Sequence, residues 1–107
     1  VAYANEVKSN ILKVSATDIE SEGAVSQTVV EQMAQNVRKL LKTDFGVATS
    51  GIAGPTGGTS EKPVGTVWIA VSSETSVISR IFQFGNLREQ NIIRSTQAAL
   101  LMLKEQL

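Results

Sequence analysis

The chain has 107 residues, with 10 basic and 10 acidic side chains and a formal net charge of zero at pH 7. The length suits one domain with a single core, and the charge balance provides no attraction to nucleic acid or to an anionic membrane. The absence of cysteine and histidine excludes a thiol nucleophile, an imidazole base, a disulfide and a zinc site with the usual ligands. The acidic residues are scattered along the chain, so we expect no bound metal ion.

No apolar run approaches the length that a membrane-spanning helix needs. The first residues also lack the succession of basic, apolar and small residues that marks a signal peptide. We therefore expect residues 1–107 to form a single domain in the cytoplasm, without a membrane or nucleic-acid partner.

The first part of the chain predicts the end of a strand and two short helices. Residues 1–3 are typical of a strand end, and Asn5 is a suitable cap for a short helix that follows it. A second short helix is expected from Thr17 to Glu22, with Gly23 as its C-terminal stop.

The clearest helix follows Ser26, a residue type that often caps helix N-termini. After it, apolar residues recur at spacings of three and four, which places them on one helix face. Lys39 and Lys42 stand in the last turn, where positive charge complements the helix dipole. The apolar residues of this face are Val30, Met33, Ala34, Val37, Leu40 and Leu41.

Three segments in the second half of the chain are typical of strands. Residues 46–50 lead into a glycine-rich loop, and residues 66–73 are apolar enough for burial on both faces. Residues 76–84 alternate more loosely, and the short SETS connection before them predicts a hairpin.

The pair Asn86 and Glu89 resembles a capping box and predicts the start of a long C-terminal helix. Strands interleaved with amphipathic helices are typical of an α/β layered fold, with helices packed on a mixed sheet. The residues that fall roughly on one side of this last helix are Ile92, Ile93, Thr96, Leu100, Leu103 and Leu107.

Residues 50–65, SGIAGPTGGTSEKPVG, form a glycine-rich segment (hereafter the glycine loop) that contains five of the 8 glycines and both prolines. Lys62 lies between Glu61 and Pro63, so the Walker A signature is absent. The glycine spacing also differs from the dinucleotide fingerprint, and the loop leads to a strand instead of a helix. Neither pattern predicts a cofactor, and none is expected.

Two interpretations of the glycine loop remain. One is a long connection whose glycines serve turns. The other is an anion-binding nest of backbone N–H groups, favoured because connections are usually about 4 to 6 residues long and longer ordered loops are often functional. Its position after a strand of an α/β sheet is also where such folds tend to bind ligands.

Side chains with useful chemistry lie on either side of the glycine loop. Lys8, near Tyr3, is a general base if its pKa is depressed, or otherwise a solvated helix lysine. Arg88 and Arg94 lie early in the last helix. Each is either a bidentate hydrogen-bond donor to a phosphate or carboxylate group, or an exposed helix arginine.

Four segments together resemble the C-terminal domain of the competence-damage inducible proteins called CinA, also found as the stand-alone nicotinamide mononucleotide deamidase PncC. The resemblance covers nearly all of the chain, and its most specific part is the glycine loop. The segments are, in order, YANEVKSNILKV, EGAVSQTVVEQMAQNVRK, SGIAGPTGGTSEKPVGTVWIAV and FGNLREQNIIRSTQAALLML.

The resemblance implies hydrolysis of nicotinamide mononucleotide to nicotinic acid mononucleotide and ammonia, in pyridine nucleotide recycling. It assigns Tyr3 and Lys8 to catalysis, where they assist a serine nucleophile. It also implies a substrate pocket made by the glycine loop and by Arg88 at the start of the last helix. The loop residues concerned are Ser50, Gly51, Ile52, Ala53, Gly54, Gly57 and Gly58.

The family's serine lies in an E-S-C-T-G-G type motif that this chain does not contain. We therefore expect the nucleophile, together with an N-terminal helix and strand of the domain, to lie outside the chain. The alternative is a non-catalytic nucleotide-binding or assembly module that uses the glycine loop as an anion nest. The sequence leaves open whether the protein forms a homo-oligomer.

Overall fold

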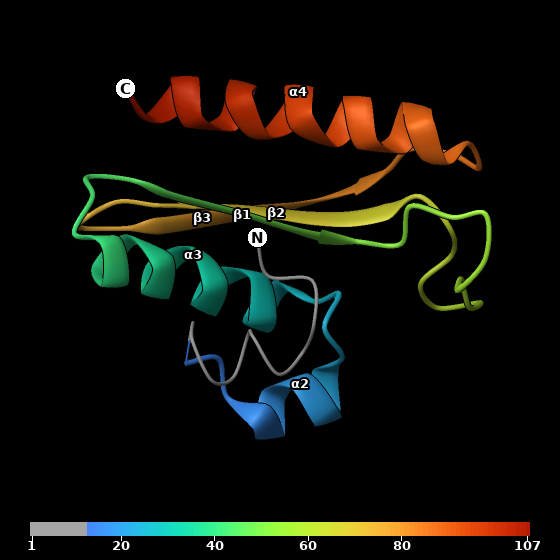
Figure 1. Cartoon of the computed structure of the whole chain (residues 1–107), viewed down its shortest axis with the longest axis horizontal. Coiled ribbons are helices and arrows are strands. Elements are labelled where there is room, and N and C mark those ends of the chain that lie inside the picture. The colour runs from blue at the N-terminus through green and yellow to red at the C-terminus, as the bar shows by residue number, and fades with distance from the viewer. Residues whose placement is uncertain (1–12) are drawn as a thin grey trace.

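The computed structural model describes residues 13–107, which form three helices and three strands (Figure 1). The strand end predicted at residues 1–3 and the helix predicted after Asn5 lie outside the described residues. In chain order the elements are α2 (Ala16–Glu22), α3 (Gln27–Leu41), β1 (Gly46–Gly51), β2 (Thr66–Ser72), β3 (Val77–Gln83) and α4 (Arg88–Gln106).

The strands form one sheet in the order β1-β2-β3, and each neighbouring pair is antiparallel. The predicted hairpin between β2 and β3 is confirmed, because Ser72 pairs with Val77 across the short connection. The α/β class with helices packed on a sheet is also confirmed. Within residues 13–107 the sheet is purely antiparallel, whereas the sequence suggested a mixed sheet.

The helices cover the sheet from both sides, with α3 on one face and α4 on the other (Figure 1). Strand β2 is buried on both faces, as its composition predicted, because alternate side chains point to opposite sides of a sheet. Ala70 belongs to the cluster beneath α3, with Val30 and Ala34, while Ile69 packs with Met102 of α4.

Helix α3 begins as predicted. The side chain of Ser26 accepts a hydrogen bond from the N–H of Val29 at 3.3 Å and donates to the carbonyl of Gly23 at 2.8 Å. Val30, Met33 and Ala34 are buried against the sheet, whereas Leu40 and Leu41 in the last turn are exposed. Val37 is partly buried against the same cluster, so the predicted apolar face is confirmed except at Leu40 and Leu41.

Helix α4 begins one residue later than a cap at Asn86 would require. Its N-cap is Leu87, which makes no side-chain cap hydrogen bond, so the predicted capping box is wrong. The helix buries Asn91, Ala99 and Met102. Ala99 and Met102 pack against the apolar side chains of β2, and the more apolar stripe is left outside.

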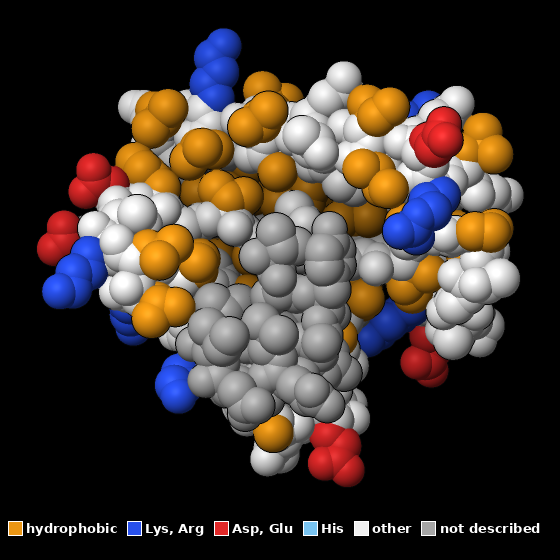
Figure 2. Space-filling view, viewed as in Figure 1, with side chains coloured by type: hydrophobic (Ala, Val, Ile, Leu, Met, Phe, Trp, Pro, Cys, Tyr) orange, Lys and Arg blue, Asp and Glu red, His pale blue; other side chains and the backbone are white. Residues whose placement is uncertain are grey.

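That outer stripe gives α4 an exposed apolar surface. Ile92, Ile93 and Leu100 are 49%, 56% and 61% exposed in this structure. Figure 2 shows the hydrophobic side chains along the helix and in the hollow beside it. The predicted apolar side of α4 exists, but within residues 13–107 it does not form the core.

Gly65 and Gly85 lie close together, and we expect their substitution by alanine to have unequal effects on stability. Gly65 has φ +92° and a Cβ there would collide with the backbone of Gly85, whereas a Cβ on Gly85 would meet nothing within 4 Å. We expect Gly65→Ala to lower the free energy of unfolding by more than about 2 kcal/mol, and Gly85→Ala by less than about 1 kcal/mol. Urea unfolding of both variants measures the difference, and equal losses would contradict this account of the close approach.

Candidate functional site

The glycine loop is closed at its base by backbone hydrogen bonds. The N–H of Ile52 donates to the carbonyl of Thr66 at 2.9 Å, and the N–H of Gly65 donates to the carbonyl of Ile52 at 2.7 Å. The hydroxyl and the N–H of Thr66 both donate to the carbonyl of Pro63. The loop is thus a defined structure that continues the β1–β2 pairing.

The tip of the loop is held by Lys62. Its Nζ donates to the carbonyl of Glu22 at the end of α2, at 2.6 Å, where a cation complements the helix dipole. The backbone N–H of Lys62 also donates to the hydroxyl of Thr59 at 3.0 Å. Lys62 therefore joins the glycine loop to the end of α2.

The loop glycines do not all have the same role. A Cβ on Gly58 would lie 2.6 Å from the backbone N of Val64, so the loop's own packing requires glycine there. Gly57 also needs glycine, because its φ is +94°, but the nearest atom to its Cβ position is 3.8 Å away. A ligand role for these two glycines stays a prediction.

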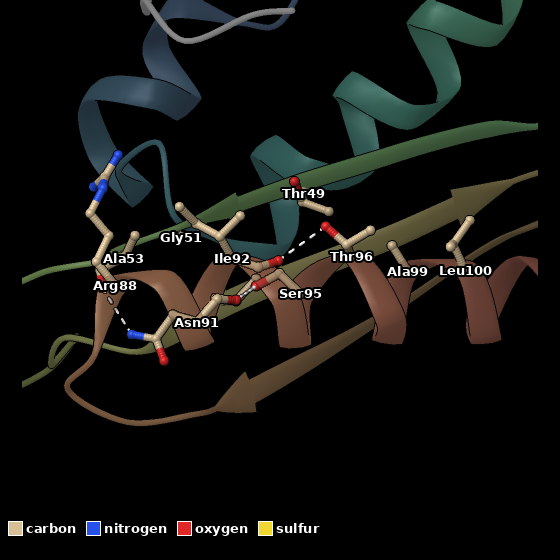
Figure 3. Close-up of a pocket in the computed structure, with 11 residues that line it drawn as sticks. Thr49, Gly51, Ala53, Arg88, Asn91, Ile92, Ser95, Thr96, Ala99 and Leu100 are labelled. Carbon is tan, nitrogen blue, oxygen red and sulfur yellow. Dashed lines mark hydrogen bonds between the residues drawn. The ribbon is translucent and has the colours of Figure 1, made fainter.

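The first turns of α4 hold the start of the loop. Asn91 is 1% exposed, and its Nδ2 donates to the carbonyl of Ala53 at 2.9 Å (Figure 3) and to the carbonyl of Gly85 at 2.8 Å. One turn earlier, Nη1 of Arg88 donates to the carbonyl of Gly54 at 3.1 Å. Two consecutive loop carbonyls therefore point at side chains from one helix face.

Arg88 occupies the first position of α4, where a positive charge opposes the helix dipole. Arg88 is an exposed residue, and its contact with Gly54 uses only one of the guanidinium nitrogens. The helix start also has no side-chain cap. A guanidinium beside uncapped backbone N–H groups is an arrangement that attracts an anion.

A cavity of about 590 Å³ lies between β1 and α4. Its apolar walls include Val67, Ala99 and Leu100, and its polar groups include Arg88 and Asn91 at one end. The volume and the mixture of apolar walls with a few polar groups are typical of a small-molecule pocket.

The hydroxyls of Ser95 and Thr96, which also line this cavity, are bound to their own helix. Ser95 Oγ donates to the carbonyl of Asn91 at 2.6 Å, and Thr96 Oγ1 donates to the carbonyl of Ile92 at 3.0 Å (Figure 3). Such bonds within a helix leave the hydroxyl oxygens as acceptors only.

The structure brings some of the predicted site residues together and separates others. Gly51, Ala53 and Arg88 line the cavity. Ser50 lies on the opposite face of β1, where it is 8% exposed and its hydroxyl donates to the carbonyl of Ala24 at 2.8 Å. Its substrate role stays a prediction.

The remaining predicted site residues belong to the glycine loop or lie outside the described part of the chain. Ile52 and Gly54 flank Ala53, and Gly57 and Gly58 lie further along the loop; none of these lines the cavity. The catalytic candidates Tyr3 and Lys8 lie outside the described residues.

Sequence reasoning missed Asn91. An amide in place of an apolar residue on a helix gives only a weak signal, and the more hydrophobic stripe through Ile92 was preferred. The informative pattern was the row of small and polar residues at Asn91, Ser95 and Ala99, spaced by four, which lines the cavity.

The oxygen of the Asn91 side chain has no hydrogen-bond partner among the described residues, although it is buried. An unpaired buried acceptor costs about 1–3 kcal/mol. The unpaired oxygen is tolerated if the two hydrogen bonds from Nδ2 stabilise the protein by more than this cost.

Within residues 13–107, no helix has both the length and the apolar character required to cross a membrane. The same residues contain no cluster of three or more side chains suited to hold a metal ion.

Comparisons with known proteins agree on one family. All residues from 1 to 107 match the family model of the CinA C-terminal domain. The chain is 47% identical over 107 residues to a CinA-like protein of Cytophaga hutchinsonii, which covers 100% of this chain and 26% of that protein. It is 46% identical over 100 residues to a putative competence-damage inducible protein of Thermoanaerobacter sp. strain X514, covering 94% of this chain and 24% of that protein.

The structural comparison gives the same result. The crystal structure of the competence/damage inducible protein CihA from Agrobacterium tumefaciens matches with a TM-score of 0.96 and 34% identity, over 98% of this chain and 65% of that chain. The present chain thus spans about a quarter of the length of these curated relatives and about two thirds of that solved structure. On this evidence, the chain belongs to the CinA C-terminal domain family.

Proposed function

We propose that this chain is the substrate-binding part of an amidohydrolase that converts nicotinamide mononucleotide to nicotinic acid mononucleotide and ammonia. The observation that carries the proposal is the junction between the glycine loop and α4. There Arg88 and Asn91 bind the carbonyls of Gly54 and Ala53 beside a cavity large enough for a small nucleotide.

In this proposal the phosphate lies near the start of α4. The guanidinium of Arg88, which binds Gly54 through one nitrogen, and the N–H groups of a helix start without a side-chain cap provide positive potential there. The nicotinamide ring then extends along the apolar wall made by Val67 and Ala99.

The chemical step belongs to residues of the whole protein. Lys8 takes the proton of a serine that lies outside this chain, and that serine attacks the carboxamide carbon. Lys8 returns the proton to the amide nitrogen as the C–N bond breaks and ammonia leaves, and water then hydrolyses the acyl-serine to nicotinic acid mononucleotide. Tyr3 orients the reacting groups. Backbone N–H groups of the glycine loop stabilise the negative oxygen that develops during the attack.

A second candidate is a nucleotide-binding or assembly module without catalysis. It is favoured by the hydroxyls of Ser95 and Thr96, which donate to their own helix carbonyls and so offer the cavity no activated nucleophile. Binding of nicotinamide mononucleotide without release of ammonia is the outcome that would support this candidate.

The reaction predicts a specific loss at Lys8. The full-length protein is expected to release ammonia from nicotinamide mononucleotide, and Lys8→Ala to reduce kcat by about a hundredfold or more, because the general base is removed. Lys104→Ala, which removes an exposed lysine near the end of α4, is the matched control. Full activity in Lys8→Ala would exclude this role.

The phosphate position predicts a difference between two arginines of one helix. We expect Arg88→Ala to weaken binding of nicotinamide mononucleotide by about tenfold to a hundredfold, since a charge-assisted hydrogen bond is lost. Arg94→Ala removes an exposed arginine that does not line the cavity, and its affinity should stay within about twofold. Calorimetric titration measures both, and equal losses would contradict the assignment to Arg88.

A further inference from the structure

Asn91 is a buried polar residue whose side chain connects three segments. Its Nδ2 donates to the carbonyl of Ala53 at the start of the glycine loop and to the carbonyl of Gly85 in the turn before α4. With 1% exposure it is closed to solvent. One amide therefore fixes the loop and the turn relative to the helix.

The C-terminal end of the glycine loop, at Gly65, contacts the same turn. The N–H of Phe84 donates to the carbonyl of Gly65 at 2.9 Å, and Gly65 approaches the backbone of Gly85 so closely that a Cβ would collide with it. Both ends of the glycine loop thus rest on backbone that Asn91 holds in place.

Holding the carbonyl of Ala53 also fixes the next N–H. The peptide bond between Ala53 and Gly54 is trans, since the only cis bond in residues 13–107 joins Gly54 to Pro55. In a planar trans peptide the oxygen and the hydrogen point in opposite directions. The N–H of Gly54 therefore points away from Asn91.

The Arg88 guanidinium contacts the same residue, because its Nη1 donates to the carbonyl of Gly54 at 3.1 Å. Figure 3 shows the Arg88 side chain extending past Ala53, with Asn91 on the opposite side of Ala53. No residue between 13 and 107 accepts a hydrogen bond from the N–H of Gly54. A free backbone donor and a partly free guanidinium therefore lie close together.

We propose that Asn91 is a positioning residue that holds the N–H of Gly54 in place to bind, together with Arg88, the phosphate of the mononucleotide substrate. This inference rests on the proposed function. If Asn91 only stabilised the fold, its substitution would affect all substrates alike. In this proposal the effect of the substitution depends on whether the substrate carries a phosphate.

Steady-state kinetics of the full-length protein test this dependence with nicotinamide mononucleotide and with nicotinamide riboside, which lacks the phosphate. Asn91→Ser removes the amide, and Asn91→Asp keeps the shape but loses both donors. Each is expected to raise KM for the nucleotide by about tenfold to a hundredfold and to leave kcat within about threefold. KM for the riboside should stay within about twofold.

The comparison of two substrates stays valid if a variant is partly unfolded, because both are measured on one preparation and KM does not depend on the amount of active protein. Asn86→Ser and Asn86→Asp are matched controls at an exposed asparagine of the same turn. An equal fall in kcat for both substrates with KM unchanged would overturn the proposal, as would the same rise in KM in the controls.

A second measurement does not depend on turnover. In the ¹⁵N-labelled full-length protein, inorganic phosphate should shift the Gly54 amide resonance saturably, and the shift should be lost in Asn91→Ser. No shift of Gly54 in the unsubstituted protein would overturn the role of Asn91. A normal shift without ammonia release from the nucleotide would support that role and reject only the proposed reaction.

Discussion

The two hydrogen bonds from the buried amide of Asn91 are the constraint on which the candidate site depends. They place the start of the glycine loop against α4, and the close approach of Gly65 to Gly85 brings the end of the loop to the same point. The loop is long and rich in glycine, so without these contacts it would have many conformations. Its defined path comes from these contacts together with hydrogen bonds within the loop, such as that from Gly65 to Ile52.

The same helix divides its side chains between two tasks. Its inner row, through Asn91, Ala99 and Met102, packs on the sheet and holds the loop. Its outer row, through Ile92 and Leu100, is exposed and forms part of the wall of the cavity (Figure 3). Ser95 and Ala99, two small side chains of the helix, line the pocket between β1 and the helix.

Local signals in the sequence predicted the elements, because their causes are local. Ser26 caps α3 through contacts within one turn, and the short connection between β2 and β3 leads to a hairpin. The buried face of α4 was not predictable in this way. The position of the helix depends on contacts such as that between Asn91 and Ala53, which are far apart in the chain, and hydrophobicity alone favours the stripe that stays outside.

The glycine loop was correctly predicted as an unusual segment, and its contacts show why. Gly58 is needed for packing against Val64, whereas the N–H of Gly54 remains free of partners among residues 13–107.

The central claim is that α4 and the loop together bind a nucleotide phosphate. A crystal structure of the full-length protein with nicotinamide mononucleotide tests it most directly. The phosphate should contact the Arg88 guanidinium and the Gly54 N–H, and a ligand bound on the Ser50 face of the sheet without these contacts would contradict the claim.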